Sequence, residues 1–504
     1  MTLILLLLIC LSLACPILAI LSGFWIEKPT MAAAYAGYCI GIGLLSSLVM
    51  LGYVSFLQVS KENQLLSING LNALLTSLVL LVSFIVHRFS IRYMYGDKYY
   101  RQFFILLSLL TFALLMMVTT NHLLLFAVAW CSADTILIRL MTHKKEWVAS
   151  RESGIIAAYS LGLGCTCLIL MSALLFIDGA TTNLSMLMQQ ASTSNSISFS
   201  IASGLLVITI LAQSGLFPFH QWLLSSLNSP TPVSAIMHGG LINGGGLLLV
   251  KFSPLFVCHK QWLIVLFLMG SLSALLGTIW KLMQHDVKKM LACSTMAQMG
   301  FMLMQCGLGL FSSAIAHICW HGLFKAYLFL TSGSAVTQKK PRIASNQYTL
   351  LSLLMAPIGG LCAMASFSVI TDYSLMSFDA NTFVLAFVFI TGTQLLLTSM
   401  GRSQHKLACL ASLLLAAFLG FIYGGSVHLI EKLLLPSLSN FSQSLGVIHG
   451  LILFLFAVFW LLFNVGGYEK IAQSKFGCWL YINLFNASLP AKKTVTSLRT
   501  DYNY

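Results

Sequence analysis

The chain has 504 residues, of which 58% are hydrophobic and only 8% are charged. Soluble domains carry about 25% charged residues, so this composition excludes an ordinary soluble enzyme. The net charge of +14 does not indicate a nucleic-acid-binding protein, because the basic residues lie in the gaps between apolar segments.

Apolar segments long enough to cross a bilayer follow one another along the whole chain. We count about fifteen, and because they are continuous they do not match the alternating strands of a membrane β-barrel. The sequence therefore predicts an all-α polytopic membrane protein. The predicted spans are residues 3–25, 32–58, 71–91, 102–119, 121–141, 155–177, 200–222, 231–256, 261–281, 286–304, 308–335, 349–370, 382–400, 407–425 and 447–466.

Basic residues concentrate in alternate gaps between these spans, and such loops mark the cytoplasmic side of a membrane protein. The pattern predicts that the N-terminus lies outside and the C-terminus in the cytoplasm. The clearest basic gaps follow the third and fifth spans, with Arg88, Arg92, Lys98 and Arg101 in one and Arg139, Lys144, Lys145 and Arg151 in the other.

Asp134 is the only acidic residue that lies clearly within a predicted span, and it shares a helix face with Trp130. Ionisable residues inside a membrane are costly and usually functional. Two interpretations remain: Asp134 forms a structural ion pair with nearby Arg139, or it is a proton-accepting carboxylate that faces the interior of the bundle.

Residues 215–246, GLFPFHQWLLSSLNSPTPVSAIMHGGLINGGG, are mostly apolar but contain Pro218, Pro230 and Pro232. We interpret them as two membrane helices broken near the bilayer centre, because a break is tolerated there only where it is buried or lines a wet cavity. Such breaks often mark an ion path. His220 and His238 lie in this stretch, and either could be structural or functional.

His317, His321 and Lys325 form the strongest cluster of titratable residues, because their spacing places all three on one stripe of one helix. The stripe covers about 12 Å of depth, and such groups can pass protons through intervening waters. A single buried histidine is usually structural, but three titratable groups in register favour a proton relay. Lys251, near the end of its own helix, either lines the same path or extends to the interface.

The 13 cysteines are scattered singly, with no zinc-binding spacing, and no glycine-rich nucleotide-binding turn is present. The sequence therefore predicts no metal, no cofactor and no catalytic residues in this chain. Any enzymatic chemistry is expected in a partner.

Four ordered blocks between residues 121 and 334 resemble the antiporter-like subunits of respiratory complex I and the large subunits of multi-subunit sodium/proton antiporters: FPFHQWL, SPTPVSAIMH, HDVKKMLACSTMAQMGF and HICWHGLFKAYLFLTSGS. This resemblance implies two inverted repeats of five helices, each with one broken helix, that conduct protons along a polar axis. It matches His238 to the family's histidine after the broken helix, and His317, His321 and Lys325 to its His-x3-His-x3-Lys helix.

The implied regions are N-terminal helices at 1–100, a first repeat at 101–256 with its break near Pro218–Pro232, a degenerate second repeat at 257–400, and C-terminal helices with a cytoplasmic tail at 401–504.

The chain also departs from the family's pumps. Those pumps usually have Trp-Glu in the fifth helix, whereas Trp130 is followed here by Cys131, and Gln213 stands where they have a lysine. In the later repeat only Pro357, as a helix break, the Gly359-Gly360 pair, and Asp372, as a possible path residue, remain as candidates. Gln213, His220 and Lys251 are the other possible path residues.

One branch of the family, the membrane subunits of the two-component DAB inorganic-carbon pumps, fits these departures. That resemblance implies a bacterial inner-membrane subunit whose proton influx drives CO2 hydration by a DabA-type partner, a peripheral zinc-containing protein similar to carbonic anhydrases. The alternatives are a proton-translocating subunit of an NADH-quinone oxidoreductase-like or Na⁺/H⁺ antiporter complex, and a non-conducting membrane anchor for a peripheral enzyme.

Overall fold

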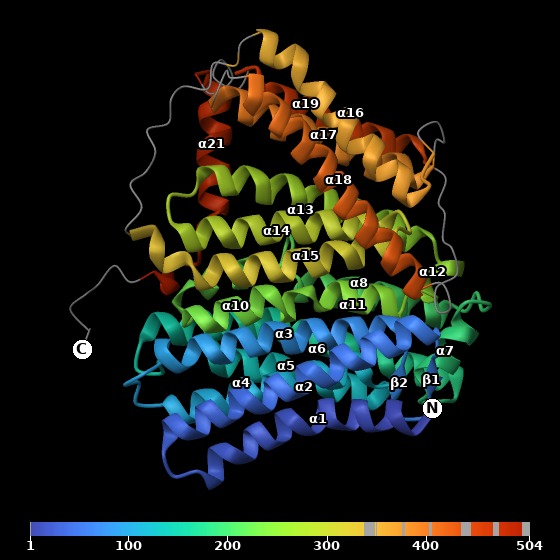
Figure 1. Ribbon diagram of the computed structural model, residues 1–504, viewed down its shortest axis with the longest axis vertical. Coiled ribbons are helices and arrows are strands. Elements are labelled where there is room, and N and C mark those ends of the chain that lie inside the picture. Colours follow the sequence, from blue (N-terminus) through green and yellow to red (C-terminus); the bar gives the residue numbers. More distant parts are fainter. Residues whose placement is uncertain are drawn as a thin grey trace. The chain divides into compact units, whose positions relative to one another are not determined.

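The computed structural model describes residues 2–336, 348, 350–374, 379–402, 406–434, 445–466 and 473–495, and these residues are almost entirely helical (Figure 1). Residues 467–472 and 496–504 of the predicted cytoplasmic tail lie outside them. The long helices are α1 Thr2–Trp25, α2 Pro29–Leu57, α3 Gly70–Tyr93, α4 Tyr100–Thr119, α5 Leu123–Met141, α6 Val148–Gly179, α8 Ile197–Gln213, α13 Gln261–Met283, α14 Val287–Gly307, α15 Phe311–Leu330, α16 Leu350–Thr371, α17 Ala380–Arg402, α18 Lys406–Leu434, α19 Val447–Asn464 and α21 Lys475–Ala487.

Short elements fill the connections between the long helices. They are the hairpin β1 Lys61–Glu62 and β2 Ser67–Ile68, the helices α7 Leu184–Ala191, α9 Gln221–Ser225, α10 Thr231–Gly239, α11 Gly244–Lys251 and α12 Leu255–Cys258, and the 3-10 turns η1 Ser226–Asn228, η2 Leu241–Asn243, η3 Ser332–Val336 and η4 Lys492–Thr494.

Each of the predicted spans coincides with one or more of these helices. Within the described residues, 12 spans are long and apolar enough to cross a membrane, with α10 and α11 together counted as one. The remaining predicted spans correspond to α8, which is short, and to α14 and α15, which carry polar side chains. The all-α polytopic membrane fold predicted from the sequence is therefore confirmed.

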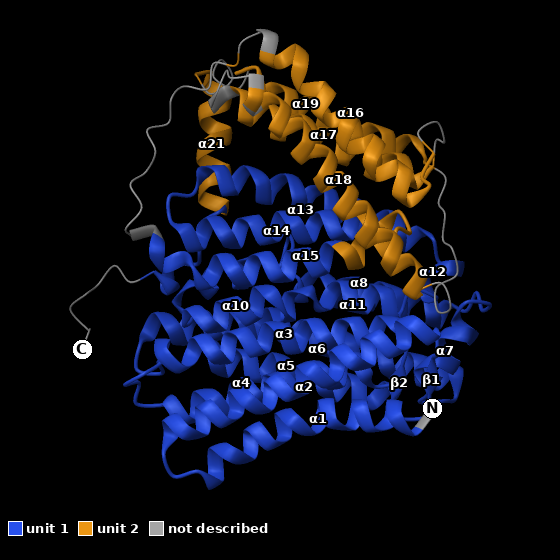
Figure 2. Cartoon of the chain, in the orientation of Figure 1, with its two compact units in different colours: residues 1–304, 317–335, 488–504 blue, residues 305–316, 336–487 orange. Residues whose placement is uncertain are grey.

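The described chain divides into two compact units (Figure 2). Unit 1 comprises residues 1–304, 317–335 and 488–504, and unit 2 comprises residues 305–316 and 336–487. The repeat boundaries inferred from the sequence stay a prediction.

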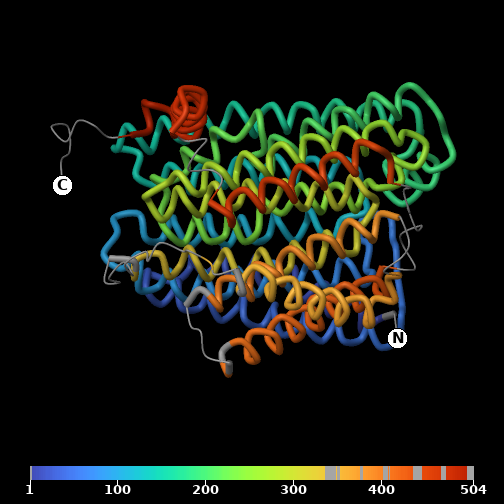
Figure 3. The backbone as a smooth tube through the Cα atoms, turned by 90° about the horizontal axis from the view of Figure 1, so that it is seen from above, coloured from blue at the N-terminus to red at the C-terminus, as the bar shows by residue number. Residues whose placement is uncertain are grey.

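In unit 1 the long helices run roughly side by side, as both views of the backbone show (Figures 1 and 3). Of the 12 membrane spans found in the described residues, the one formed by α10 and α11 is the most enclosed, with 94% of its most apolar stretch buried, against 33% for α1. A peripheral helix such as α1 exposes large apolar side chains, as expected of a helix that faces lipid. The interrupted span therefore lies at the centre of the unit, where broken backbone is shielded from lipid.

The interruptions in this region lie partly elsewhere than the prolines suggest. Helix α8 ends at Gln213, and Pro218 lies in the following turn, as predicted. In contrast, Pro230 is the residue just before α10 and Pro232 lies in its first turn, so both begin a helix. The break in that span is at Gly240–Asn243, and His238 lies just before the break instead of after it.

The three glycines at the start of α11 allow three helices to approach it closely. A Cβ atom at Gly244 would lie 3.1 Å from the Trp130 ring of α5, and one at Gly246 would overlap the Ile318 side chain of α15. At Gly245 it would meet the Ser214 hydroxyl, just after α8. The glycine run is thus required by packing around the broken span.

Helices α10 and α15 also meet through glycines. A Cβ at Gly322 would lie 2.7 Å from the carbonyl oxygen of Gly239 and 3.1 Å from Nδ2 of Asn243. We expect Gly322→Ala to destabilise the protein by about 1–3 kcal/mol, because backbone atoms would have to separate. Thermal unfolding in detergent measures this. Gly162→Ala is the matched control, since a Cβ there meets nothing within 4 Å, and an equal loss in both variants would contradict the close-packing argument.

In unit 2, α16 runs without interruption through Pro357. The helix break predicted at this proline is therefore absent. The helix continues on both sides of Pro357 although proline has no backbone N–H group to donate to the preceding turn. Asp372 follows α16 directly, in a left-handed conformation with φ of 56°, and its side chain is exposed.

Candidate functional site

Asp134 lies in the middle of α5 and is only 2% exposed. Its Oδ1 accepts a hydrogen bond from Nε2 of Gln213 at 3.0 Å, and its Oδ2 accepts one from the Cys165 thiol of α6 at 3.3 Å. No salt bridge joins Asp134 to Arg139, which is exposed. The structural ion pair considered from the sequence is therefore wrong, and the carboxylate has neutral partners.

Gln213 explains how this site departs from the related pumps. It is the last residue of α8 and is 1% exposed, and the resemblance described above implies a lysine at this position in the family's pumps. Here Asp134 accepts a hydrogen bond from this residue directly. The site thus pairs a buried acidic group with an amide.

The residues of the relay predicted on α15 lie on one continuous helix. The rings of His317 and His321 are stacked, with centroids 6.0 Å apart and an interplanar angle of 14°. Nδ1 of His321 lies 3.1 Å from Oδ1 of Asn243 at the break. Within the described residues, Nε2 of each histidine has no hydrogen-bond partner.

Lys325 lies one turn beyond His321 and is 1% exposed. Its Nζ donates to the carbonyl oxygen of Leu291 in α14 at 3.1 Å. Among the described residues no carboxylate pairs with it, which is unusual because burial penalises an unpaired charge. This feature marks Lys325 as a functional candidate.

His238 and His220 are both buried, in different surroundings. His238 stacks on Phe329 of α15, with ring centroids 4.2 Å apart, so it faces the helix that carries Lys325. His220 packs between Phe217 and Trp280, with centroids 5.8 and 4.7 Å away. The structure thus brings His238, but not His220, against the helix that carries the relay.

Lys251 closes the C-terminal end of α4. Its Nζ donates to the carbonyl oxygens of Met117, Val118 and Thr120 at 3.2, 3.0 and 2.7 Å, and it lies over the Phe126 ring. These carbonyls have no partner within the helix and carry the negative end of its dipole. This geometry favours a helix-capping role for Lys251 over a place in the ion path.

We expect Lys251→Met to lower the free energy of unfolding by about 1–3 kcal/mol, since several charge-assisted hydrogen bonds are lost. Ion flux per folded molecule should stay unchanged. Thermal unfolding and flux in liposomes measure the two effects, with the exposed Lys260→Met as the matched control. Lost flux with normal stability would instead place Lys251 in the path.

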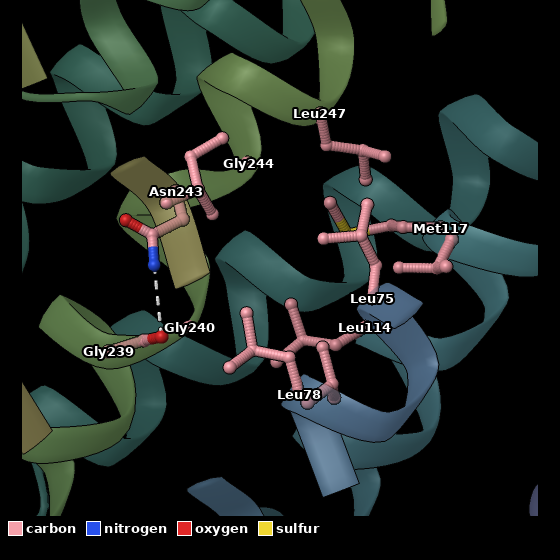
Figure 4. A pocket seen from close by; sticks show the side chains of 12 residues that line it. Leu75, Leu78, Leu114, Met117, Gly239, Gly240, Asn243, Gly244 and Leu247 are labelled. Atoms are coloured by element: carbon pink, nitrogen blue, oxygen red, sulfur yellow. Dashed lines mark hydrogen bonds between the residues drawn. The ribbon is translucent and has the colours of Figure 1, made fainter. Parts of the chain in front are cut away.

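A polar connection joins the Asp134 site to the α15 relay through the broken span. Ser214, which follows Gln213 in the chain, donates its hydroxyl hydrogen to the carbonyl oxygen of Ile242 at 3.3 Å. Asn243, which follows Ile242, contacts His321. Next to the break lies a small cavity of about 40 Å³, lined mainly by apolar side chains of α3 and α4 and by Asn243 and Gly240 (Figure 4). Its volume is sufficient for a water molecule, but its mainly apolar lining offers a water few hydrogen-bond partners.

Asn243 was not singled out from the sequence, where an asparagine among glycines looks like an ordinary turn residue. His87 in α3 was also missed. Its Nδ1 lies 2.8 Å from the Ser83 carbonyl oxygen and its Nε2 lies 3.1 Å from the Ser108 hydroxyl, which joins α3 to α4. Since both ring nitrogens are bonded, His87 has the geometry of a structural residue.

Among the residues that the structure describes, no group of three or more His, Cys, Asp or Glu side chains is arranged to hold a metal ion, and the cysteines are free thiols. Pro357 and Asp372 belong to unit 2, whereas the other candidate residues belong to unit 1.

Comparison with known proteins identifies the family. Residues 120–371 match the family described as NADH:quinone oxidoreductase/Mrp antiporter, TM, and residues 63–104 match NADH-Ubiquinone oxidoreductase (complex I), chain 5 N-terminus. The chain is 37% identical to the probable inorganic carbon transporter subunit DabB1 of Halothiobacillus neapolitanus, over 55% of this chain and 50% of that protein. It is 36% identical to the DabB subunit of Bacillus subtilis, over 67% of each protein. The match thus spans about half the length of the first relative and two thirds of the second.

Two solved structures share the fold. The Mrp complex from Dietzia sp. DQ12-45-1b has a TM-score of 0.59 and 22% identity over 99% of this chain and 54% of that one. The membrane-bound sulfane sulfur reductase, an archaeal respiratory membrane complex, has a TM-score of 0.60 and 17% identity over 96% of both chains. The chain belongs to the NADH:quinone oxidoreductase/Mrp antiporter transmembrane family, and within it the chain is similar to the DabB inorganic carbon transporter subunits.

Proposed function

We propose that this chain is the proton-conducting membrane subunit of an inorganic-carbon accumulation complex. Protons enter the cell through it, and a DabA-type zinc-containing partner uses their influx to convert CO2 to bicarbonate. The proposal places the chain in a bacterial inner membrane with its N-terminus outside, and assigns the catalysis and the zinc to the partner.

The observation that carries this proposal is the polar connection through the broken span of unit 1. It runs from the buried carboxylate of Asp134 to Gln213, and from the neighbouring Ser214 to the Ile242 carbonyl oxygen. Asn243, the residue after Ile242, then contacts His321 on α15. Broken membrane helices with charged or polar groups at mid-depth are typical of ion paths. We assign proton transfer to Asp134, His238, His317, His321 and Lys325.

The energetics fit a coupled subunit. A proton that moves down a potential of about 100 mV releases about 2.3 kcal/mol. About 1.4 kcal/mol corresponds to a tenfold change in an equilibrium, so one proton can bias a nearly reversible hydration by well over tenfold.

Growth rescue tests the proposal. The chain and a DabA-type partner are expressed together in a bacterial host that lacks carbonic anhydrase and therefore does not grow in air. We expect growth only when both proteins are present. No growth with the two proteins demonstrably assembled in the membrane would contradict the proposal.

A second function, a non-conducting membrane anchor, has its own support. Gln213 carries no charge, and α16 lacks the predicted break at Pro357. An anchor needs only assembly, so a variant that lacks Lys325 would assemble and keep full activity. A conductor with the same replacement would assemble but lose its activity.

A further inference from the structure

We propose that Asn243 is a positioning residue that holds a proton on Nδ1 of His321, so that Nε2 is the atom that accepts and releases a mobile proton. The tautomer follows from geometry alone, whereas the role of Nε2 in proton transfer rests on the proposed function.

The first step concerns the backbone at the break. In a continuous helix the Asn243 N–H would donate to the Gly239 carbonyl four residues back, but here it donates to Gly240 at 3.1 Å. The Gly239 carbonyl oxygen would lack this partner in a buried site. The side chain of Asn243 supplies one instead, because its Nδ2 donates to that oxygen at 3.0 Å (Figure 4).

The second step fixes the orientation of the amide. A carbonyl oxygen only accepts hydrogen bonds, so the NH₂ end of Asn243 must face Gly239. The opposite end, Oδ1, therefore faces Nδ1 of His321 at 3.1 Å. Rotating the amide by half a turn would set two acceptors against each other at Gly239.

The third step assigns the histidine proton. Oδ1 of an amide also only accepts, so Nδ1 of His321 must be the donor. In the neutral ring the lone pair then lies on Nε2, which has no hydrogen-bond partner within the described residues although His321 is only 5% exposed. Nε2 is thus the nitrogen that is available to bind another proton.

Close packing surrounds this arrangement. A Cβ atom at Gly322, next to His321, would meet both the Gly239 carbonyl oxygen and the Asn243 amide, so the glycine allows α15 to lie close against the break. The hydrogen bond that completes the broken helix and the one that sets the tautomer therefore belong to the same side chain.

Solid-state ¹⁵N NMR of histidine-labelled protein in liposomes, at mildly alkaline pH where imidazole is neutral, tests the inference. The His321 signals are identified as those lost in His321→Gln. In the wild-type protein we expect Nδ1 to carry the hydrogen and Nε2 to be bare. The opposite tautomer in the wild type would overturn the proposal, and this test needs no variant at Asn243.

Variants at Asn243 separate positioning from general structure. In Asn243→Leu we expect the Nε2-protonated form to become the major tautomer and proton flux to fall on the order of tenfold. Asn243→Asp should keep the hydrogen on Nδ1, since a carboxylate oxygen also accepts, but it should lower stability because its second oxygen faces the Gly239 carbonyl oxygen. Asn72→Leu is the control, because this buried asparagine of α3 donates to the Ser67 carbonyl and should leave the His321 signals unchanged.

Two further outcomes are decisive. An unchanged tautomer in a folded Asn243→Leu variant would contradict the positioning role. A wild-type protein with the expected tautomer but no proton flux would leave the tautomer assignment intact and would instead contradict the proposed function.

Discussion

Replacing Lys325 with alanine or methionine is expected to reduce proton flux on the order of 100-fold or more, the contribution typical of a positioned proton-transfer group. Lys325 is 1% exposed, and its ammonium group lies one turn beyond the His321 ring. Neither alanine nor methionine can carry a proton. Methionine fills most of the volume, so the fold and the assembly with a partner should persist. Flux of an imposed proton gradient into liposomes measures the effect.

Lys98→Ala is the matched control for the lysine variants. Its side chain is 75% exposed and pairs with Glu146 at 3.6 Å, and surface pairs of this kind contribute little to stability. We expect normal flux in this variant. Normal flux in both Lys325 variants would remove Lys325 from the proton path and favour the anchor.

Asp134→Asn is expected to have a similarly large effect on flux, on the order of 100-fold. The amide oxygen of asparagine can still accept the hydrogen bond from Gln213, so the free energy of unfolding should change by only about 1 kcal/mol. The variant loses the ability to bind and release a proton, and it also loses the weak hydrogen bond from the Cys165 thiol, because an NH₂ group replaces Oδ2. Flux in liposomes and thermal unfolding measure the two quantities separately.

Asp178→Asn serves as the control for this variant, because Asp178 is an exposed residue at the C-terminal end of α6. Its flux should match the wild type. If Asp134→Asn retained full flux, the carboxylate would not be part of the path, and its hydrogen bonds to Gln213 and Cys165 would serve only to join α5, α6 and α8.

The sequence was sufficient to predict which helices carry the residues of the site, but not which side chains of different helices contact one another. The spacing of His317, His321 and Lys325 was sufficient to place them on one stripe of a helix, because α-helical periodicity is local. The enclosure of residues 231–251 also followed from their composition, since glycines and a histidine in an apolar span require shielding from lipid.

Contacts between residues far apart in the chain could not be predicted from local sequence patterns. Arg139 is close to Asp134 in sequence, but five residues along a helix turn the side chain to another face, and the partner proved to be Gln213 from α8. The break at Gly240 was assigned to the preceding prolines because Pro230 and Pro232 resemble helix breakers, whereas the structure uses them to begin α10.

The role of Asn243 could not be predicted because it depends on two groups from different helices. Its side chain bonds Gly239 across the break and His321 on α15, and only the folded backbone brings these groups together. An asparagine beside several glycines carries no such signal in the sequence alone.

The most direct test of the central claim is bicarbonate accumulation in right-side-out membrane vesicles that contain this chain and a DabA-type partner. The vesicles are supplied with CO2, with and without an imposed inward proton gradient, and with a protonophore as control. Our account predicts accumulation that requires the gradient and that is lost in Lys325→Met vesicles with the complex intact. Accumulation that persists after the protonophore has collapsed the gradient would contradict it, and would leave the chain as an anchor for its partner.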